Sequence, residues 1–201
     1  MKDVLGANTA AIYYDNDDYG SGLKNAFVAE AEKIGMEMLG EEAYQREATL
    51  DFSPAIDKFD FRDPDIILIA GLYNEAASIV KQSREKGVET QFIGGDGLFS
   101  PALIEIGGEA VEGLLLTTPF IVHAGTDDPR ARSFRTAFME KFSDREPDTW
   151  AALTYDAANQ LFDVIGRVGP DRRAIRDGLA AANSPETAYI GVTGATYFDE
   201  H

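Results

Sequence analysis

Short apolar runs alternate with stretches of helical periodicity up to Thr118, and this alternation constrains the fold more than any other feature. The run at residues 65–70 is the clearest, because its apolar residues follow one another without polar alternation, as in a parallel strand covered on both faces. Parallel neighbours need crossover connections, which the intervening helical stretches supply. The alternation therefore predicts an α/β fold with a doubly wound, mostly parallel five-stranded sheet and helices on both faces.

The predicted elements divide the chain into two parts. Strands are expected at residues 10–14, 36–44, 65–70, 91–94 and 113–117, and helices at 20–34, 52–61, 74–86, 101–106, 127–142, 149–168 and 171–181. In the second helix, Ser53 is expected at the N-cap and Pro54 at the first helical position. Residues 191–200 read as a turn-rich segment with a strand-like end. We expect an α/β ligand-binding core at residues 1–148 and a helical segment at 149–201.

Composition and charge exclude several partners and chemistries. The 35 acidic and 18 basic residues give a net charge of -17, which repels nucleic acid and anionic membrane surfaces. The absence of cysteine excludes disulfides, thiol catalysis and thiolate metal sites. His123 and His201 stand far apart in the sequence, and no glycine-rich cofactor motif follows the first strand, so we expect neither a metal nor a cofactor. Residues 1–4 lack the apolar core of a secretion signal, which an exported protein loses on maturation.

Four residues that follow predicted strands are candidates for ligand binding. Tyr19 follows the first strand, Leu72 and Tyr73 follow the third, and Asp96 follows the fourth. The carboxyl ends of parallel strands open on one edge of the sheet, where ligands of such folds bind. An aromatic face, an apolar contact and a carboxylate suit a small ligand that carries a cationic amine. An equally good interpretation is that the tyrosines cap the sheet edge and Asp96 is a turn residue among glycines.

The same positions carry a resemblance to a known family. It rests on residues 12–22 (IYYDNDDYGSG), 91–97 (QFIGGDG), 112–115 (EGLL), 154–158 (TYDAA), 191–194 (GVTG) and 198–200 (FDE). In this order and spacing, the segments resemble lobe 2 of type I periplasmic solute-binding proteins. The closest group is the leucine/isoleucine/valine-binding family of ABC importers. The resemblance covers nearly all of the chain, and the ordered set of motifs carries it rather than any single one.

The resemblance implies roles for the four candidate residues. Tyr19 would pack against the ligand, and Asp96 would accept hydrogen bonds from its α-ammonium group. Leu72 and Tyr73 would line the pocket for the ligand's side chain. The family often has glutamate at the position of Asp96, and aspartate keeps the charge with one methylene less reach.

The resemblance also implies a function without catalysis. The chain would belong to the extracytoplasmic solute-binding component of an ABC importer, periplasmic or extracellular and either lipid-anchored or soluble. Its partners would be a small ligand, most readily an amino acid, and a membrane permease. A ligand-sensing regulator of the same fold, of the amide-sensor type, is an alternative. A small enzyme with a carboxylate base at Asp96 or Asp18 is a third, although a lone acid without a partner group is weak evidence for catalysis.

The family's two-lobed architecture makes the extent of the chain informative. The resemblance places lobe 2 and a C-terminal piece of lobe 1 in this sequence, without the lobe 1 sheet that contacts the ligand carboxylate. We therefore expect little or no amino-acid affinity from this chain alone. The second of its C-terminal helices carries one apolar stripe, formed by Leu153, Ala157, Leu161, Val164 and Ile165. An uncovered stripe must fold back on lobe 2 or pair with another copy, and we expect a homodimer through residues 149–181.

Overall fold

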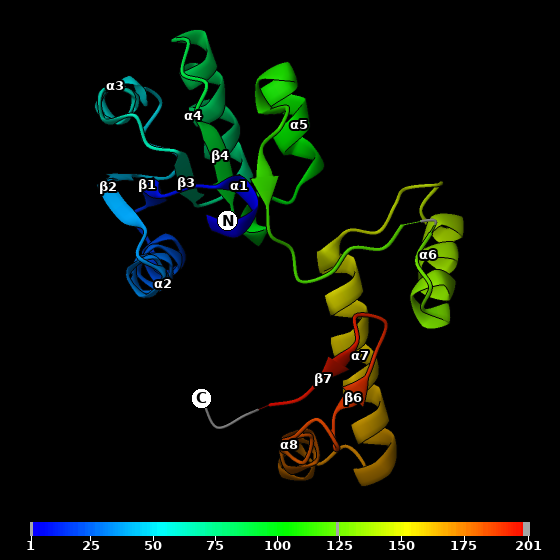
Figure 1. The fold of residues 1–201 in the computed structure, drawn as a ribbon. Helices are drawn as coiled ribbons and strands as arrows, with labels where there is room; N and C mark the ends of the chain where they lie inside the picture. The colour runs from blue at the N-terminus through cyan, green and yellow to red at the C-terminus, as the bar shows by residue number, and fades with distance from the viewer. Residues whose placement is uncertain (1, 124, 199–201) are drawn as a thin grey trace. The chain divides into compact units, whose positions relative to one another are not determined.

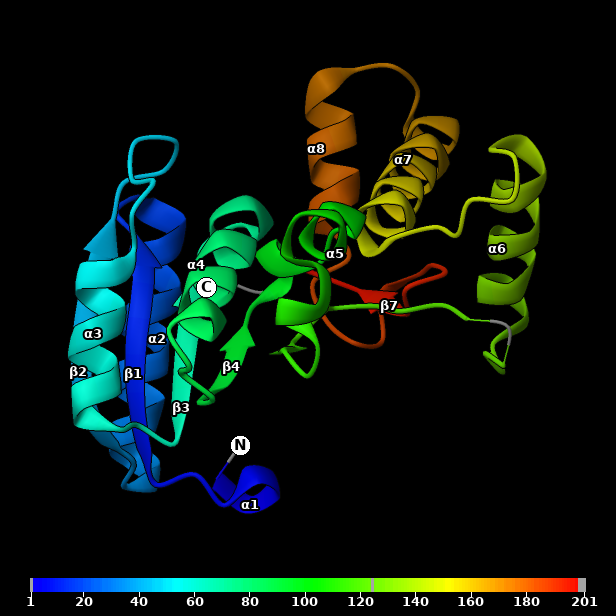
Figure 2. The same ribbon diagram turned by 90° about the horizontal axis from the view of Figure 1, so that it is seen from above.

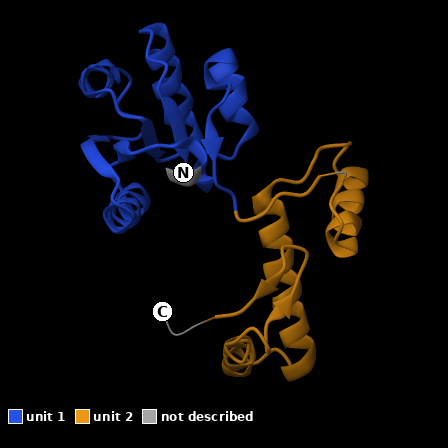
Figure 3. Ribbon diagram, in the orientation of Figure 1, with its two compact units in different colours: residues 1–118 blue, residues 119–201 orange. Residues whose placement is uncertain are grey.

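A computed structural model describes residues 2–123 and 125–198, which form two compact units, 1–118 and 119–201 (Figure 3). We call them unit 1 and unit 2. Among the described residues, no helix has both the length and the apolar character needed to cross a membrane.

Unit 1 alternates strands and helices as predicted. Its strands are β1 (Thr9–Asp15), β2 (Glu37–Tyr44), β3 (Ile66–Ala70), β4 (Gln91–Gly94) and β5 (Leu115–Leu116). Its helices are α1 (Lys2–Leu5), α2 (Asp18–Ile34), α3 (Ser53–Arg62), α4 (Tyr73–Glu85) and α5 (Pro101–Gly107), with 3₁₀ turns η1 (Asp96–Leu98) and η2 (Gly108–Val111). The short α1 and both 3₁₀ turns were not predicted. β5 has two residues where five were predicted, because only Leu115 and Leu116 pair with β4.

The five strands are parallel and lie in the order β2-β1-β3-β4-β5 (Figures 1 and 2). The predicted doubly wound parallel sheet is thus confirmed. The chain moves outward from β1 to β2 and then returns to place β3 on the other side of β1. The strand order therefore reverses between β1 and β3, and a switch point of this kind is where α/β sheets bind ligands.

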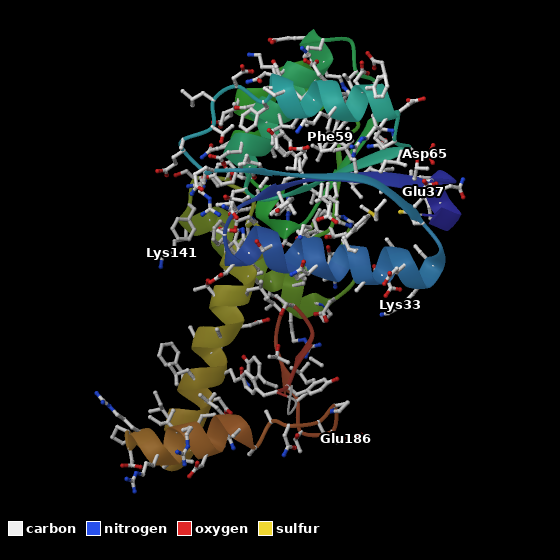
Figure 4. The ribbon with its side chains drawn as sticks, turned by 90° about the vertical axis from the view of Figure 1, so that its left-hand side faces the viewer. Lys33, Glu37, Phe59, Asp65, Lys141 and Glu186 are labelled. Carbon is white, nitrogen blue, oxygen red and sulfur yellow. The ribbon has the colours of Figure 1, made fainter. Side chains whose placement is uncertain are left out.

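Helices cover both faces of this sheet (Figures 1 and 4). Successive residues of a strand point to opposite faces, so Ala10 and Ile12 join the cluster under α2, while Ala11 and Tyr13 join the cluster under α3 and α4. Phe59 belongs to α3, and its side chain packs in the cluster between this helix and the strands (Figure 4). The two buried clusters hold the sheet rigid, so that the loops at its carboxyl edge start from fixed points.

The start of α3 differs from the prediction. Ser53 is the first helical residue, and Phe52 holds the N-cap position without a side-chain cap. Asp51 supplies the missing acceptor, since its Oδ1 accepts a hydrogen bond of 3.0 Å from the Ser53 N–H. The Ser53 prediction was wrong because an acidic residue two positions upstream performs the same task.

Unit 2 contains helices α6 (Pro129–Lys141), α7 (Thr149–Val168) and α8 (Arg172–Ala180), followed by an antiparallel hairpin of β6 (Tyr189–Ile190) and β7 (Ala195–Thr196). The strand-like end expected near residue 200 falls partly outside the described residues. Unit 2 begins at residue 119, and Phe134 of α6 shares a buried cluster with Ala152 of α7 and Val192 of the hairpin. The expected division at residue 149 stays a prediction. The assignment of residues 149–201 to another lobe stays a prediction.

Candidate functional site

Three loops at the carboxyl edge of the sheet converge on Gly97. A Cβ atom at this glycine would lie 2.7 Å from the Gly71 carbonyl oxygen, 2.9 Å from the Tyr19 hydroxyl and 3.1 Å from Leu72 Cδ2. These three neighbours come from the loops that follow β3 and β1, while Gly97 follows β4. Only glycine leaves room for such an approach. The loops around the switch point therefore form one surface.

A hydrogen bond joins two of the predicted site residues across this surface. Tyr19 lies in the first turn of α2, and its hydroxyl donates to Asp96 Oδ1 over 2.8 Å. The same hydroxyl accepts from the Gly97 N–H over 3.1 Å. Burial raises the pKa of Tyr19, and the hydrogen bond to Asp96 raises it further. At neutral pH the phenol therefore stays protonated and bound to Asp96, while 37% of the residue remains exposed.

The Asp96 carboxylate keeps an uncompensated charge. No Lys, Arg or His in the described part of the chain forms an ion pair with it, and its Oδ2 has no hydrogen bond there. Asp15 and Asp17, at the end of β1, differ in this respect because both bind Arg46. A half-buried, unpaired carboxylate beside a tyrosine ring is suited to an ammonium group, which gains a charge-assisted hydrogen bond and contact with the aromatic ring.

Leu72 and Tyr73 separate in the structure. Leu72 precedes α4 in an extended conformation, and its side chain reaches the neighbourhood of Gly97. Tyr73, the first residue of α4, packs against the cluster beneath α3 and α4. The structure therefore brings Tyr19, Leu72 and Asp96 together and places Tyr73 against the core. Whether any of them contacts a ligand stays a prediction.

Arg46 was missed by the sequence reasoning. It follows the end of β2, and its guanidinium binds the carboxylates of Asp15 and Asp17. A signal was present, since Arg46 is a basic residue just after a predicted strand and Asp15 to Asp18 follow the neighbouring one. Across residues 2–123 and 125–198, no cluster of three or more His, Cys, Asp or Glu side chains could hold a metal ion.

An open parallel sheet with aromatic and carboxylate side chains at its switch point is the architecture of an α/β ligand-binding protein. The family model of the periplasmic binding proteins matches residues 1–201. The chain belongs to the type I periplasmic binding proteins, in the leucine/isoleucine/valine-binding family. The predicted resemblance is confirmed.

Two curated relatives illustrate the extent of the match. The Leu/Ile/Val-binding protein homolog 1 of Brucella suis is 32% identical over 193 residues, which cover 94% of this chain and 49% of the relative. The Leu/Ile/Val-binding protein homolog 2 of Brucella abortus is 31% identical over 172 residues, which cover 84% and 44%. The chain therefore spans about half the length of the curated relatives it matches.

Solved structures agree with this assignment. The leucine-binding protein LivK of Thermotoga maritima superposes with a TM-score of 0.89 and 35% identity, over 99% of this chain and 55% of the neighbour. The substrate-binding protein LivJ of Streptococcus pneumoniae, solved in complex with isoleucine, gives a TM-score of 0.86 and 30% identity, over 99% and 55%. Both neighbours are binding proteins of branched-chain amino acids by their descriptions.

Proposed function

We propose that this chain supplies one half of an amino-acid site in the solute-binding component of an ABC importer. The observation that carries the proposal is the unpaired Asp96 carboxylate, held by Tyr19 at the switch point of the sheet. The descriptions of relatives and neighbours as leucine-, isoleucine- or valine-binding proteins support the ligand class. The chain acts by binding and not by catalysis.

In the proposed binding mode, this half-site contacts the ammonium group and the side chain of the ligand. The α-ammonium group binds Asp96 Oδ2, and the aliphatic side chain packs against Tyr19 and Leu72. The ligand carboxylate finds no cation beside Asp96 in the described residues, so its partners come from lobe 1, which closes over the ligand by a hinge motion. One half-site alone therefore binds weakly, with a Kd above about 1 mM.

Membership of the family supports a proposal for the partners and the location. The complete protein is periplasmic or extracellular, lipid-anchored or soluble, and delivers its ligand to a membrane permease. Self-association through residues 149–181 is a further part of the proposal. It is supported by the exposed apolar side chains of α7, among them Trp150 at 48% and Leu161 at 37% exposure, because exposed apolar patches of this kind favour association.

A titration with three related ligands tests the ammonium assignment. Amide NMR shifts of the ¹⁵N-labelled chain would be followed with leucine, with isoamylamine, which lacks the carboxylate, and with isocaproate, which lacks the amine. We expect leucine and isoamylamine to shift the Gly97 resonance, because Asp96 reads the ammonium group alone. Isocaproate should leave it in place. Shifts caused by isocaproate but not by isoamylamine would refute the proposal.

Two substitutions make the titration specific. Asp96→Asn removes the charge and keeps the shape, so the amine-dependent shifts should disappear. Asp18→Asn is the matched control, because Asp18 is an exposed acid next to Tyr19 that forms no hydrogen bond or ion pair with Asp96 within the described residues. An equal loss in both variants would mean that general charge attraction, rather than the Asp96 site, produces the shifts.

A further inference from the structure

Arg46 connects the loop after β2 to the loop that carries Tyr19. Its Nε donates to Asp15 Oδ2 over 2.6 Å, and its Nη2 donates to Asp17 Oδ2. Asp15 is buried, with 1% of the residue exposed, whereas about a third of the Arg46 side chain remains accessible. The guanidinium thus bridges a buried carboxylate at the end of β1 and the carboxylate that starts α2.

The local fold explains why the arginine reaches these acids. The parallel register places Asp15 opposite Tyr44, so Arg46 follows two residues beyond the paired position. The chain then turns tightly, because the Gln45 carbonyl accepts hydrogen bonds from the Ala48 and Thr49 N–H groups. This turn keeps Arg46 beside the end of β1.

Asp17 transmits the contact to Tyr19. Its Oδ1 accepts from the Gly20 N–H over 2.7 Å and so caps the N-terminus of α2, while its Oδ2 binds Arg46. Tyr19 lies between the capping residue and the capped N–H group, in the first turn. A cap that cannot rotate fixes the direction in which Tyr19 leaves the helix. The hydroxyl then meets Asp96 and Gly97.

The charge balance separates Arg46 from an ordinary surface arginine. Within the described residues, Asp15 Oδ1 and the Tyr44 hydroxyl are buried without hydrogen-bond partners, so Arg46 is the group that compensates the buried Asp15 charge. The single positive charge of Arg46 is shared by Asp15 and Asp17. Asp96 accepts a hydrogen bond from Tyr19 but has no ion-pair partner among the described residues.

We propose that Arg46 is a positioning residue of the ligand half-site: by binding Asp15 and Asp17 together, it presets Tyr19 against Asp96 before the ligand arrives. The role of Arg46 in ligand binding rests on the proposed function. The structural coupling from Arg46 to the Tyr19 hydroxyl does not depend on any ligand. The proposed function and the coupling can therefore fail separately.

Hydrogen exchange of the Gly20 and Gly97 amides tests the coupling. In Arg46→Gln, both amides should exchange at least about tenfold faster than global destabilisation alone explains, because Asp17 can rotate and Tyr19 detaches. Lys58→Gln is the matched control, since it removes an ion pair of 2.7 Å between Lys58 and Glu42 of β2. It should leave both amides unchanged. Equal exchange in the two variants would overturn the inference.

A double variant separates positioning from stability. Asp15→Asn with Arg46→Gln removes the buried charge together with its partner, so global stability should recover relative to Arg46→Gln alone. The Gly97 amide should stay unprotected, because Asp17 still lacks the guanidinium. Recovery of Gly97 protection along with stability would reduce Arg46 to a structural role and overturn the proposal. Arg46→Lys should rescue only part of the protection, since an ammonium lacks the two-pronged geometry.

The ligand readout completes the test. The shift of Gly97 at a fixed isoamylamine concentration should fall at least about threefold in Arg46→Gln and in the double variant. If exchange responds but isoamylamine shifts no resonance in the unsubstituted chain, the half-site function fails while the coupling stands. If isoamylamine shifts persist undiminished in both variants, Arg46 does not position the site.

Discussion

Units 1 and 2 obtain their stability in different ways. The sheet of unit 1 has a buried apolar cluster on each face, with members from every layer. The described cluster of unit 2 has three buried apolar members, Phe134, Ala152 and Val192. Its longest helix, α7, also buries polar side chains, among them Asp156 and Gln160. Apolar burial thus stabilises the sheet of unit 1 on both faces, while buried polar contacts add to the small apolar cluster described in unit 2.

The largest expected effect follows from the core of unit 1. Ile69 is fully buried in the cluster beneath α3 and α4. Ile69→Ala should cost about 2–5 kcal/mol of the free energy of unfolding, from lost transfer energy and the cavity that remains. Urea unfolding, monitored by hydrogen exchange of the unit 1 amides, measures this loss of stability. Ile175→Ala, in the half-buried face of α8, should cost about 1 kcal/mol or less. Equal costs would contradict the contrast between the units.

The second prediction concerns the polar contact that organises unit 2. Asp156 is buried and accepts three hydrogen bonds, from Val192 N at 2.8 Å, Thr193 N at 2.8 Å and Thr193 Oγ1 at 2.7 Å. Asp156→Ala leaves these donors unpaired, at a cost of about 2–3 kcal/mol. The Val192 and Thr193 amides should then exchange faster, while the amides of β3 keep their protection. Loss of protection in both units together would show that they are not energetically separate.

The comparison also shows what the sequence could reveal. The apolar run of β3 and the periodicity of α7 depend on local pattern, and α7 has the predicted bounds. Tyr19 and Asp96 could be placed on one edge because the carboxyl ends of parallel strands must meet there. The link from Arg46 to Asp15 and Asp17 depends on strand register and on a turn of five residues, which no local pattern specifies.

Two details at neighbouring residues have the same origin. Ser53 and Asp51 are both good capping residues, and the choice between them depends on the backbone conformation of Phe52. Leu72 and Tyr73 are adjacent, so which of them reaches Gly97 is decided by where α4 begins. Tertiary contacts settle such choices between neighbours.

Alkaline pH should increase the difference in stability between units 1 and 2. Tyrosines with a raised pKa are Tyr13, Tyr19 and Tyr44 in unit 1 and Tyr189 in unit 2. Burial and nearby acids raise the pKa of Tyr13 to about 12. Such a group stabilises the fold fully below its unfolded pKa of about 10, and that contribution is lost as the pH rises through the folded value. The raised pKa of Tyr13 alone should lower the free energy of unfolding at pH 11 by about 1.4 kcal/mol relative to neutral pH.

The measurement is urea unfolding between pH 9 and about 11, where tyrosine in the unfolded chain ionises. Stability of unit 1 should decline with pH, and Tyr13→Phe should flatten the slope because its ring cannot ionise. Tyr189→Phe should leave that slope unchanged. A unit 1 profile that is flat in the unsubstituted chain would contradict the assignment.

The smallest expected effect concerns the exposed face of α7. Of the predicted apolar stripe, Val164 is buried, Leu153 and Ile165 are half-buried, and Ala157 and Leu161 are exposed. Trp150 extends this face because it lies seven residues before Ala157, at helical spacing. If copies associate through it, Leu161→Glu should weaken the dimer about fivefold, or about 1 kcal/mol, by placing a charge in the contact. Light scattering over a concentration series measures the change.

A leucine in unit 1 provides the matched control. Leu50 is 81% exposed and precedes α3, so Leu50→Glu introduces the same charge at a more exposed leucine outside the proposed contact. The dimer should persist in this variant, because a single exposed leucine outside the contact contributes little to association. A clean monomer of the unsubstituted chain at micromolar concentration would exclude the dimer. Equal weakening by Leu50→Glu would show that the effect comes from added charge in general, and the assignment of the contact to α7 would have to be abandoned.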